Sequence, residues 1–261
     1  ETVEKVLRLY REQYFDHNVR HFVQSLREEH GIKLSYTWIK TALQTAGLVA
    51  RSRKRGAHRK RRPRRPLPGM LLHVDASTHA WLGAGRGKQD LIVVFDDATS
   101  QVYYARMVEQ ESTETVMAAL KAVVAQQGVF CALYCDRGSH FAFTPLAGAE
   151  PDRHQKTQIG RASEQLNIEL ILAHSPQARG RCERLFGTWQ GRLVAELRRR
   201  QITTPEAANR FLERTWIGYH NRTFSVPAQQ SGTAFVPYPG GDLDKIFSLQ
   251  QERVVGNDNT V

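Results

Sequence analysis

Residues 132–141 read Ala-Leu-Tyr-Cys-Asp-Arg-Gly-Ser-His-Phe, a short apolar run that ends in a carboxylate and a turn-forming glycine. This pattern predicts a buried strand that delivers Asp136 to the rim of a sheet, where ligands commonly bind. A single Asp-x-Gly sequence says little, since both residues also fill ordinary turns. The site therefore depends on whether other carboxylates reach the same rim.

The segments around this strand predict an α/β fold. Three β-rich segments precede it, and helical and apolar segments alternate after it. The expected order is strand 70–78, strand 91–96, strand 102–108, helix 113–127 capped by Ser112, strand 131–135, loop 142–156, helix 157–167, strand 168–172, helix 181–200 and helix 205–219. It predicts a mixed five-stranded sheet with helices on both faces.

The composition is that of a globular protein and excludes several classes. Of 261 residues, 41% are hydrophobic and 24% are charged, which is too apolar for a disordered chain. No apolar run approaches the roughly 20 residues of a membrane span, so we expect no membrane association. The three cysteines form no C-x-x-C pair, which argues against a disulfide framework or a zinc module and favours a reducing cytoplasm.

Nearly all of the net charge of +11 lies in one segment, because residues 51–65 carry ten lysines and arginines and no acid. Prolines in and after this segment favour an extended linker over 51–68. A dense run of one sign repels itself unless a polyanion neutralises it, so we expect contacts to DNA phosphates. The candidate contacts are Arg51, Arg53, Lys54, Arg55, Arg59, Lys60, Arg61, Arg62, Arg64 and Arg65.

Residues 1–50 show helical periodicity, with Gly31 and Gly47 as helix ends and Ser35 as an N-cap. Two amphipathic helices joined by a short turn fit a helix-turn-helix with residues 36–45 in the recognition position. A small helical bundle that packs on another surface is the alternative. The adjacent basic segment favours DNA binding, with Tyr36, Thr37 and Lys40 as candidate contacts.

Asp75 lies inside an apolar strand, on the side of Leu71 and His73 if side chains alternate. A carboxylate in such a strand is costly unless its charge is compensated, and a metal ion is the usual compensation. If the first and fourth strands are neighbours, Asp75 and Asp136 can share cations.

Glu183 is the third candidate carboxylate, near the start of the helix expected over 181–200. It falls roughly 60° from the centre of that helix's apolar stripe, so we expect it to lean over the sheet edge rather than into solvent. A glutamate that merely favours the helix dipole is the ordinary alternative. Arg181, Arg184 and Arg192 occupy other faces, where they could contact phosphates.

Other polar residues near these segments are weaker candidates. Asp96 and Asp97 end a strand and suit a turn, and Glu164 and Glu169 lack the setting of a loop followed by a basic helix. His73 and His140 flank the proposed site and could contact a phosphate or a water molecule that attacks it. His17 and His21 are spaced like a metal pair, but without a cysteine pair we interpret them as two surface histidines.

The ordered set of motifs resembles bacterial insertion-sequence transposases with a retroviral-integrase-like core. It comprises the helix-turn-helix, the basic linker, His73-Val74-Asp75, Tyr134-Cys135-Asp136-Arg137-Gly138, Gly180-Arg181-Cys182-Glu183-Arg184, Tyr219-His220-Asn221-Arg222 and Ser225-Val226-Pro227-Ala228. The stretch 177–189 looks most like the ISNCY group, and the resemblance covers about residues 16–237.

The resemblance implies an RNase H-like fold and a catalytic, metal-binding triad of Asp75, Asp136 and Glu183. It also implies two Mg²⁺ ions, with Mn²⁺ as a substitute, nicking at transposon ends, and attack of the freed 3′-OH on target DNA. The implied partners are terminal inverted repeats, target DNA and further copies of the chain, in the bacterial nucleoid. The gap of 46 residues between Asp136 and Glu183 is longer than in many relatives. Gln190 stands where integrases commonly carry a lysine, a role that Arg184 or Arg192 could fill.

We therefore expect a helix-turn-helix domain over 1–50, a basic linker over 51–68, a catalytic domain over 69–237 and an unassigned tail over 238–261. Two alternatives to a transposase stay open. One is a DNA-binding regulator without catalysis, and the other is a nuclease of the same fold that never joins DNA ends.

Overall fold

The structure is a computed structural model that describes residues 1–51, 62–143, 155–173 and 180–251. Its contacts divide the chain into two compact units. Unit 1 comprises Glu1–Pro63, Ala80–Lys88 and Arg184–Thr204, and unit 2 comprises Arg64–His79, Gln89–Glu183 and Pro205–Val261. No helix in the described part of the chain is long and apolar enough to cross a membrane.

Three helices form the N-terminal part of unit 1: α1 (Thr2–Glu12), α2 (Val19–His30) and α3 (Tyr36–Thr45). The side chain of Asn18 caps α2 and that of Ser35 caps α3, while Gly31 ends α2 in the left-handed conformation with φ 66°. Glycine adopts this conformation without a steric penalty. The predicted helices and both of their predicted boundaries at Gly31 and Ser35 are confirmed. Their apolar faces form one core that includes Val6, Tyr14, Phe22, Leu26, Ile39 and Leu43.

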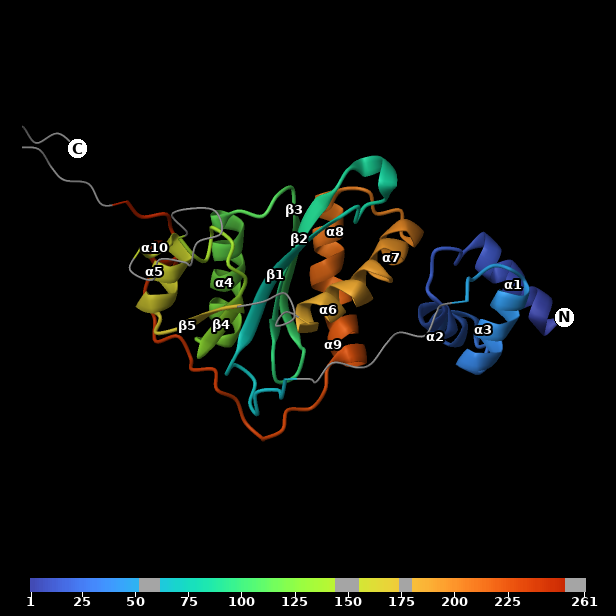
Figure 1. Cartoon of the computed structure of the whole chain (residues 1–261), viewed down its shortest axis with the longest axis horizontal. Coiled ribbons are helices and arrows are strands. Elements are labelled where there is room, and N and C mark those ends of the chain that lie inside the picture. Colours follow the sequence, from blue (N-terminus) through green and yellow to red (C-terminus); the bar gives the residue numbers. More distant parts are fainter. Residues whose placement is uncertain (52–61, 144–154, 174–179, 252–261) are drawn as a thin grey trace, which may run out of the picture. The chain divides into compact units, whose positions relative to one another are not determined.

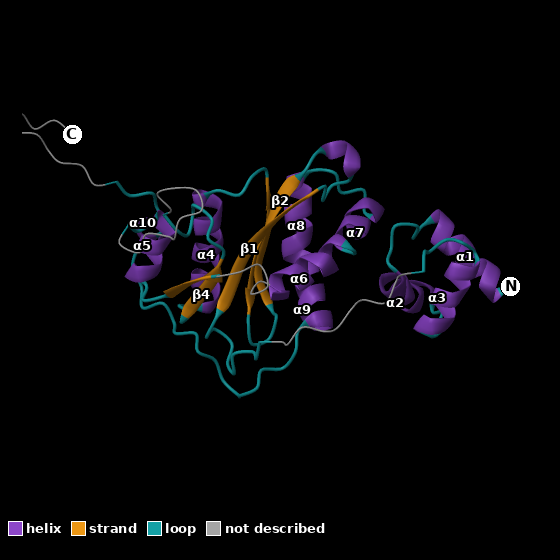
Figure 2. Ribbon diagram, in the orientation of Figure 1, coloured by secondary structure: helices purple, strands orange, loops and turns teal. Residues whose placement is uncertain are grey.

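A single five-stranded sheet organises unit 2 (Figures 1 and 2). Its strands are β1 (Leu72–His79), β2 (Gln89–Asp96), β3 (Val102–Val108), β4 (Ala132–Cys135) and β5 (Glu169–Leu172). Their spatial order is β3-β2-β1-β4-β5. The first three strands form an antiparallel meander, whereas β4 and β5 run parallel to β1. This mixed sheet confirms the predicted RNase H-like fold class, and each strand lies within two residues of its predicted bounds.

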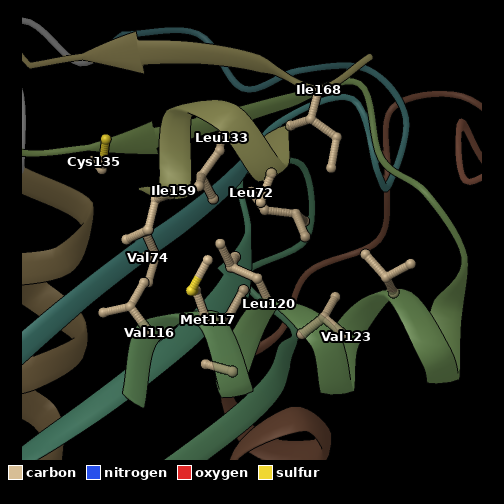
Figure 3. Close-up of a cluster of buried hydrophobic side chains, with 14 of the residues drawn as sticks. Leu72, Val74, Val116, Met117, Leu120, Val123, Leu133, Cys135, Ile159 and Ile168 are labelled. Atoms are coloured by element: carbon tan, nitrogen blue, oxygen red, sulfur yellow. The ribbon is translucent and has the colours of Figure 1, made fainter. Parts of the chain in front are cut away.

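The main core fills the sheet face that α4 (Thr113–Gln127) and α5 (Gln158–Gln165) cover. Figure 3 shows Leu72 and Val74 of β1 and Leu133 of β4 directed toward Val116 and Leu120 of α4. Ser112 accepts a hydrogen bond from the backbone of Thr115 and so fixes the start of α4, as the sequence predicts. Alternate residues of β1 therefore point to the opposite face.

That opposite face is covered by a helical segment after residue 204, and Figure 1 shows α4 and α8 on opposite sides of the sheet. The segment comprises α8 (Pro205–Phe211), the π-helix η3 (Leu212–Trp216) and α9 (Ile217–Phe224), so it runs five residues beyond its predicted end at 219. Two asparagines in it pair with the backbone of the edge strand β3. Asn209 bonds N–H and C=O of Met107 at 2.7 and 2.8 Å, and Asn221 bonds those of Val102 at 2.8 and 2.9 Å. These amides satisfy polar groups that an edge strand would otherwise expose.

The prediction of one long helix over 181–200 is wrong. The chain instead forms two helices, α6 (Gly180–Gln190) and α7 (Leu193–Arg199), with a break between them. Glycine weakens a helix interior, and Gly191 lies at the break. The Asn18 side chain donates to the Gly191 carbonyl at 2.8 Å, and a Cβ at this glycine would lie 3.1 Å from the Asn18 amide nitrogen. Arg192 then starts α7 with a non-helical φ of −137°.

The part of the C-terminal tail that the structure describes contains a short helix, α10 (Leu243–Ile246), which Asp242 caps. Val236 forms an isolated antiparallel bridge with Val129, the residue that follows Gly128 at the end of α4. Leu243 and Ile246 pack against the main core. Val236, at the end of the predicted catalytic domain, and the described part of the unassigned tail thus extend the α4 side of unit 2.

Candidate active site at the ends of strands β1 and β4

Asp75 lies on β1, and Asp136 directly follows the parallel neighbouring strand β4. Leu72 pairs with Leu133 and His73 with Tyr134, so continuing this register by two residues places Asp75 opposite Asp136. Neighbouring strands lie about 4.8 Å apart, and residues at one level of a parallel pair point to the same face. The sequence expectation that the first and fourth strands are neighbours is confirmed.

Both aspartates belong to the sheet face opposite α4, because Leu72, Val74 and Leu133 point into the main core. Asp75 lies among apolar residues of β1 and is only 8% exposed. A carboxylate is stable there only with charge compensation or hydrogen bonds. That Asp75 binds a cation stays a prediction.

Asp136 follows the last residue of β4 and is half-buried. Its Oδ1 accepts a hydrogen bond from the backbone of Gly138 at 2.8 Å. A Cβ at Gly138 would lie 2.9 Å from the same oxygen, which is closer than real Cβ contacts come. The glycine thus lets the turn fold back on the carboxylate, which explains the Asp-x-Gly sequence.

The first turn of α6 lies against this same face. Cys182 is 2% exposed, and its Sγ lies 3.9 Å from Nδ1 of His73, two residues before Asp75 on β1. Glu183 is next in the chain, and its side chain is exposed, contrary to the expectation that it leans away from solvent. That Glu183 is the third carboxylate stays a prediction.

A buried ion cluster around Asp97 holds this turn in place. Asp97 is 0% exposed, and its Oδ1 lies 2.8 Å from Nε2 of His73 and 3.1 Å from Nε of Arg181. Its Oδ2 accepts the backbone N–H of Arg65 at 2.8 Å. One carboxylate therefore joins β1, the start of α6 and the segment that precedes β1.

The electrostatics of the cluster favour an ionised Asp97. Burial by itself raises the pKa of this carboxyl, but the hydrogen bonds from His73 and Arg65 and the charges of His73 and Arg181 lower the pKa to about 2. Asp96 differs, because burial outweighs its hydrogen bonds from Gly69 and Thr99 and raises its pKa. Both residues stand at the predicted turn after β2. The side-chain partners of Asp97 were not predicted, because they lie too far away in sequence for a local pattern to reveal.

The other candidate residues have different surroundings. His73 is 0% exposed and bonded to Asp97, so the expectation that it contacts a phosphate or the attacking water is wrong. His140 Nδ1 lies 3.1 Å from the hydroxyl of Thr113 at the start of α4. Glu164 pairs with Lys156, and Glu169 is exposed on the edge strand β5.

The predicted basic contacts fall into three groups. Arg53, Lys54, Arg55, Arg59, Lys60 and Arg61 lie outside the described residues. Arg51, Arg62, Arg65 and Arg184 are exposed, while Arg64 donates to the Asp97 and Ala98 carbonyls and Arg181 pairs with Asp97. Arg192 is 7% exposed and bonds Gln24, so the expectation that it contacts DNA is wrong.

The residues proposed for base or phosphate contact on α3 share one exposed surface. Tyr36 and Thr37 are exposed and Lys40 is half-exposed, whereas Ile39 and Leu43 are buried in the helical core. The guanidinium of Arg20 on α2 lies 5.3 Å from the centre of the Tyr36 ring. This surface of α3 combines aromatic and basic groups, as nucleic-acid contacts do.

The carboxylate types fit a hard divalent cation. Mg²⁺ takes carboxylate oxygens and keeps several of its waters, so it needs only one or two direct carboxylate ligands at a time. Among the described residues, Asp75, Asp136 and Glu183 do not form a group whose ligand atoms all lie within 4.8 Å of one another. The group that does so consists of His17, His21 and Glu196 in unit 1. His17 and His21 are 2% and 4% exposed, so their interpretation as surface histidines is wrong.

Two curated proteins are similar to the chain over nearly its whole length. A putative transposase, y4bF, of Sinorhizobium fredii is 30% identical over 96% of the chain. The transposase for insertion sequence IS1202 of Streptococcus pneumoniae is 30% identical over 98% of it. The chain spans only 58% and 61% of the lengths of these relatives. The resemblance to insertion-sequence transposases that the motifs predict is thereby confirmed. No protein-family model matches the chain.

Solved structures with a similar arrangement include retroviral integrases. A chain of the simian T-cell lymphotropic virus intasome in complex with PP2A regulatory subunit B56 gamma matches 82% of this chain and 72% of its own length, with a TM-score of 0.49 and 16% identity. The dimeric HTLV-2 integrase catalytic core domain in complex with magnesium matches 63% of this chain and 94% of its own length, with a TM-score of 0.44 and 15% identity.

Proposed function

We propose that this relative of the insertion-sequence transposases carries the catalytic core of a DNA transposase. In this proposal the enzyme binds transposon ends, nicks them and joins the freed 3′-OH to target DNA. The observation that carries the proposal is the parallel register of β1 and β4, which supports Asp75 opposite Asp136 when it is continued by two residues. The sequence similarity to a putative transposase and to an insertion-sequence transposase supports the same conclusion.

The proposed cofactor is Mg²⁺, with Mn²⁺ as a substitute and two ions in the working complex. Asp75, Asp136 and Glu183 would hold these ions. When bound, such ions activate the attacking oxygen and stabilise the departing one in phosphodiester chemistry. Asp75 is nearly buried and Glu183 is exposed, which suits a site completed when DNA covers the face.

Asp97 serves the proposed site as a positioning residue. Its ion pair with Arg181 and its hydrogen bond with His73 fix the turn of α6 that carries Glu183 relative to the strand that carries Asp75. Such preorganisation matters because a displacement of about 1 Å at a reacting group can cost about 100-fold in rate.

The proposed DNA contacts come from two groups of residues. Tyr36, Thr37 and Lys40 on α3 would contact the transposon end, and the basic segment 51–65 would contact phosphates beside it. Arg184 is exposed one residue after Glu183 and would contact the phosphates at the cleavage site. We propose that copies of the chain assemble on DNA, because joining two ends to one target needs two active sites.

The test is a cleavage assay on DNA that carries the terminal inverted repeats, with Mg²⁺ or Mn²⁺. Asp75→Asn and Asp136→Asn should each abolish nicking and joining while they leave DNA binding intact. Glu169→Gln is the matched control, because this exposed carboxylate lies on the same sheet but outside the proposed site. It should retain full activity. Full activity in either aspartate variant would refute the assignment.

The products of the same assay distinguish a transposase from the alternative enzyme. A transposase should yield DNA in which the transposon 3′ end is covalently joined to target. Cleaved ends that never join would identify a nuclease of this fold. No metal-dependent cleavage of any terminal repeat would instead favour a DNA-binding regulator.

A further inference from the structure

Unit 1 contains a buried group of potential metal ligands that the proposed DNA chemistry does not use. It consists of His17, His21 and Glu196, whose ligand atoms all lie within 4.8 Å of one another. Their side chains are 0%, 5% and 10% exposed. In the described ranges 1–51, 62–143, 155–173 and 180–251, this is the only group of three or more such residues at that spacing.

Local structure brings the three residues together. His17 precedes α2 and His21 lies in its first turn, so the two imidazoles stack with centroids 4.0 Å apart and planes 11° apart. Glu196 comes from the first turn of α7. The break at Gly191 makes this possible, since the same Asn18 that caps α2 holds the Gly191 carbonyl.

The distances suit a small tetrahedral ion. With bonds of about 2.0–2.2 Å to nitrogen and oxygen, neighbouring ligand atoms around tetrahedral zinc lie about 3.4 Å apart. Glu196 Oε1 lies 3.0 Å from His21 Nε2 and 3.6 Å from His17 Nε2. These two distances bracket the expected separation. Because the rings are stacked and a nitrogen lone pair lies in its ring plane, the two imidazoles must turn about their side-chain bonds for both Nε2 atoms to bind one ion.

One of these nitrogens is otherwise unsatisfied. His17 Nε2 is buried without a hydrogen-bond partner in the described part of the chain, as is His21 Nδ1. Leaving a buried polar atom unpaired is costly. A metal ion on Nε2 of both rings would satisfy His17 and would use the nitrogen of His21 that already faces Glu196.

The surroundings provide the outer partners that metal-binding histidines have. Asp16 Oδ1 lies 3.2 Å from Nδ1 of His17. If Nδ1–H donates a hydrogen bond to this oxygen, the lone pair of the ring is on Nε2, which faces Glu196. A carboxylate in this position orients the ring and increases its basicity. Arg198 holds Asp16 in turn, with N···O distances of 2.6 and 2.8 Å.

The two oxygens of Glu196 have different arginine partners. Arg200 bonds Oε2, whereas Arg199 forms a longer ion pair with Oε1, with Nη1 at 3.5 Å. Oε1 is thus the oxygen of Glu196 that faces both histidines.

We propose that His17 Nε2, His21 Nε2 and Glu196 Oε1 form a structural site for a divalent transition metal of the zinc class. Two imidazoles and one carboxylate select such an ion over Mg²⁺ or Ca²⁺, which prefer oxygen ligands. The ion would tie the start of α2 to α7. This proposal does not depend on the proposed DNA chemistry.

The experiment uses the full chain without an affinity tag, stripped of metal with a chelator. Zinc affinity is measured by competition with a chromophoric chelator, and the absorption spectrum of the Co²⁺-loaded protein reports the coordination geometry. The variants are His21→Asn, Glu196→Gln and Asp16→Asn. His30→Gln is the control, because His30 also lies in α2 but contacts the Tyr14 hydroxyl instead.

The wild-type chain should bind one zinc ion with a submicromolar Kd and give a tetrahedral Co²⁺ spectrum. His21→Asn and Glu196→Gln should weaken zinc binding at least 100-fold, and loss of the outer carboxylate in Asp16→Asn should weaken it about 10–100-fold. His30→Gln should bind as the wild type does. Zinc should raise the unfolding temperature of the wild type but not of Glu196→Gln. Absence of stoichiometric binding to the wild type, or unchanged affinity in both ligand variants, would overturn the proposal.

Discussion

Replacing Asp97 with asparagine tests how the first turn of α6 is held against the sheet. The change keeps the shape of the side chain but removes the charge that pairs with Arg181 and bonds His73. The pKa of Asp97 falls from 3.8 to about 2 on folding. At about 1.36 kcal/mol per unit, the ionised carboxylate contributes roughly 2–3 kcal/mol to the free energy of unfolding. No reduction for solvent screening is needed, because Asp97 is 0% exposed.

The pH dependence of this contribution has a definite sign. Because the pKa is lower in the folded chain, the stabilisation is fully present above the unfolded value of 3.8 and is lost as pH falls toward about 2. Asp97→Asn should therefore be roughly 2–3 kcal/mol less stable at neutral pH, as measured by urea unfolding. The difference between variant and wild type should narrow below about pH 4.

The same variant should lose more activity than its stability explains. Domains typically have an unfolding free energy of about 5–15 kcal/mol, so a loss of this size leaves most of the molecules folded. In the folded variant, however, Glu183 would no longer be held in position relative to Asp75. We expect nicking of terminal-repeat DNA to fall at least about 100-fold at a temperature where the variant is folded. Asp96→Asn is the control, because Asp96 is equally buried but bonds Gly69 and Thr99 instead of α6. Wild-type stability and nicking in Asp97→Asn would refute the reasoning.

Three further predictions concern DNA binding, pH and the core. If the segment 51–65 neutralises six to ten phosphates, the logarithm of the DNA-binding constant should fall with the logarithm of the salt concentration with a slope of about −5 to −9. Replacing the ten cations of this segment with glutamine should flatten the slope, as measured by filter binding. Burial lowers the pKa of His220 from 6.5 to about 4, so the free energy of unfolding should fall by up to about 3 kcal/mol as pH drops through that window. In His220→Gln this part of the pH dependence should disappear from urea titrations, and an unchanged profile would argue against a neutral buried histidine. Leu120→Ala, at a 2% exposed core position, should cost about 2–5 kcal/mol, whereas Leu249→Ala, at a position 53% exposed, should cost little.

Local patterns in the sequence were sufficient for most of the fold. The ends of β3 and α4 coincide with their predicted residues. For α4 the signals are local, because the Ser112 side chain caps the start of the helix and Gly128, with a positive φ, ends it. Asp136 could be identified because an apolar strand ends directly before it. Its partnership with Asp75 needed only the assumption that β1 and β4 are neighbours.

Contacts between distant residues explain what the sequence did not reveal. The break between α6 and α7 depends on Asn18, which lies far from Gly191 in sequence, so helical periodicity alone predicts one long helix. The burial of His17 and His21 depends in the same way on Glu196. From the sequence alone, Asp96 and Asp97 look like ordinary turn residues at the end of a strand. The structure shows that Asp97 also pairs with Arg181, which is distant in sequence.

The central claim is that Asp75, Asp136 and Glu183 hold the ions of a phosphodiester-transfer site. Anomalous diffraction from a crystal of the chain bound to terminal-repeat DNA and Mn²⁺ tests it most directly. We expect manganese beside the scissile phosphate, held by Asp75, Asp136 and Glu183. Bound DNA with manganese on other carboxylates, or with none at the aspartates, would contradict it.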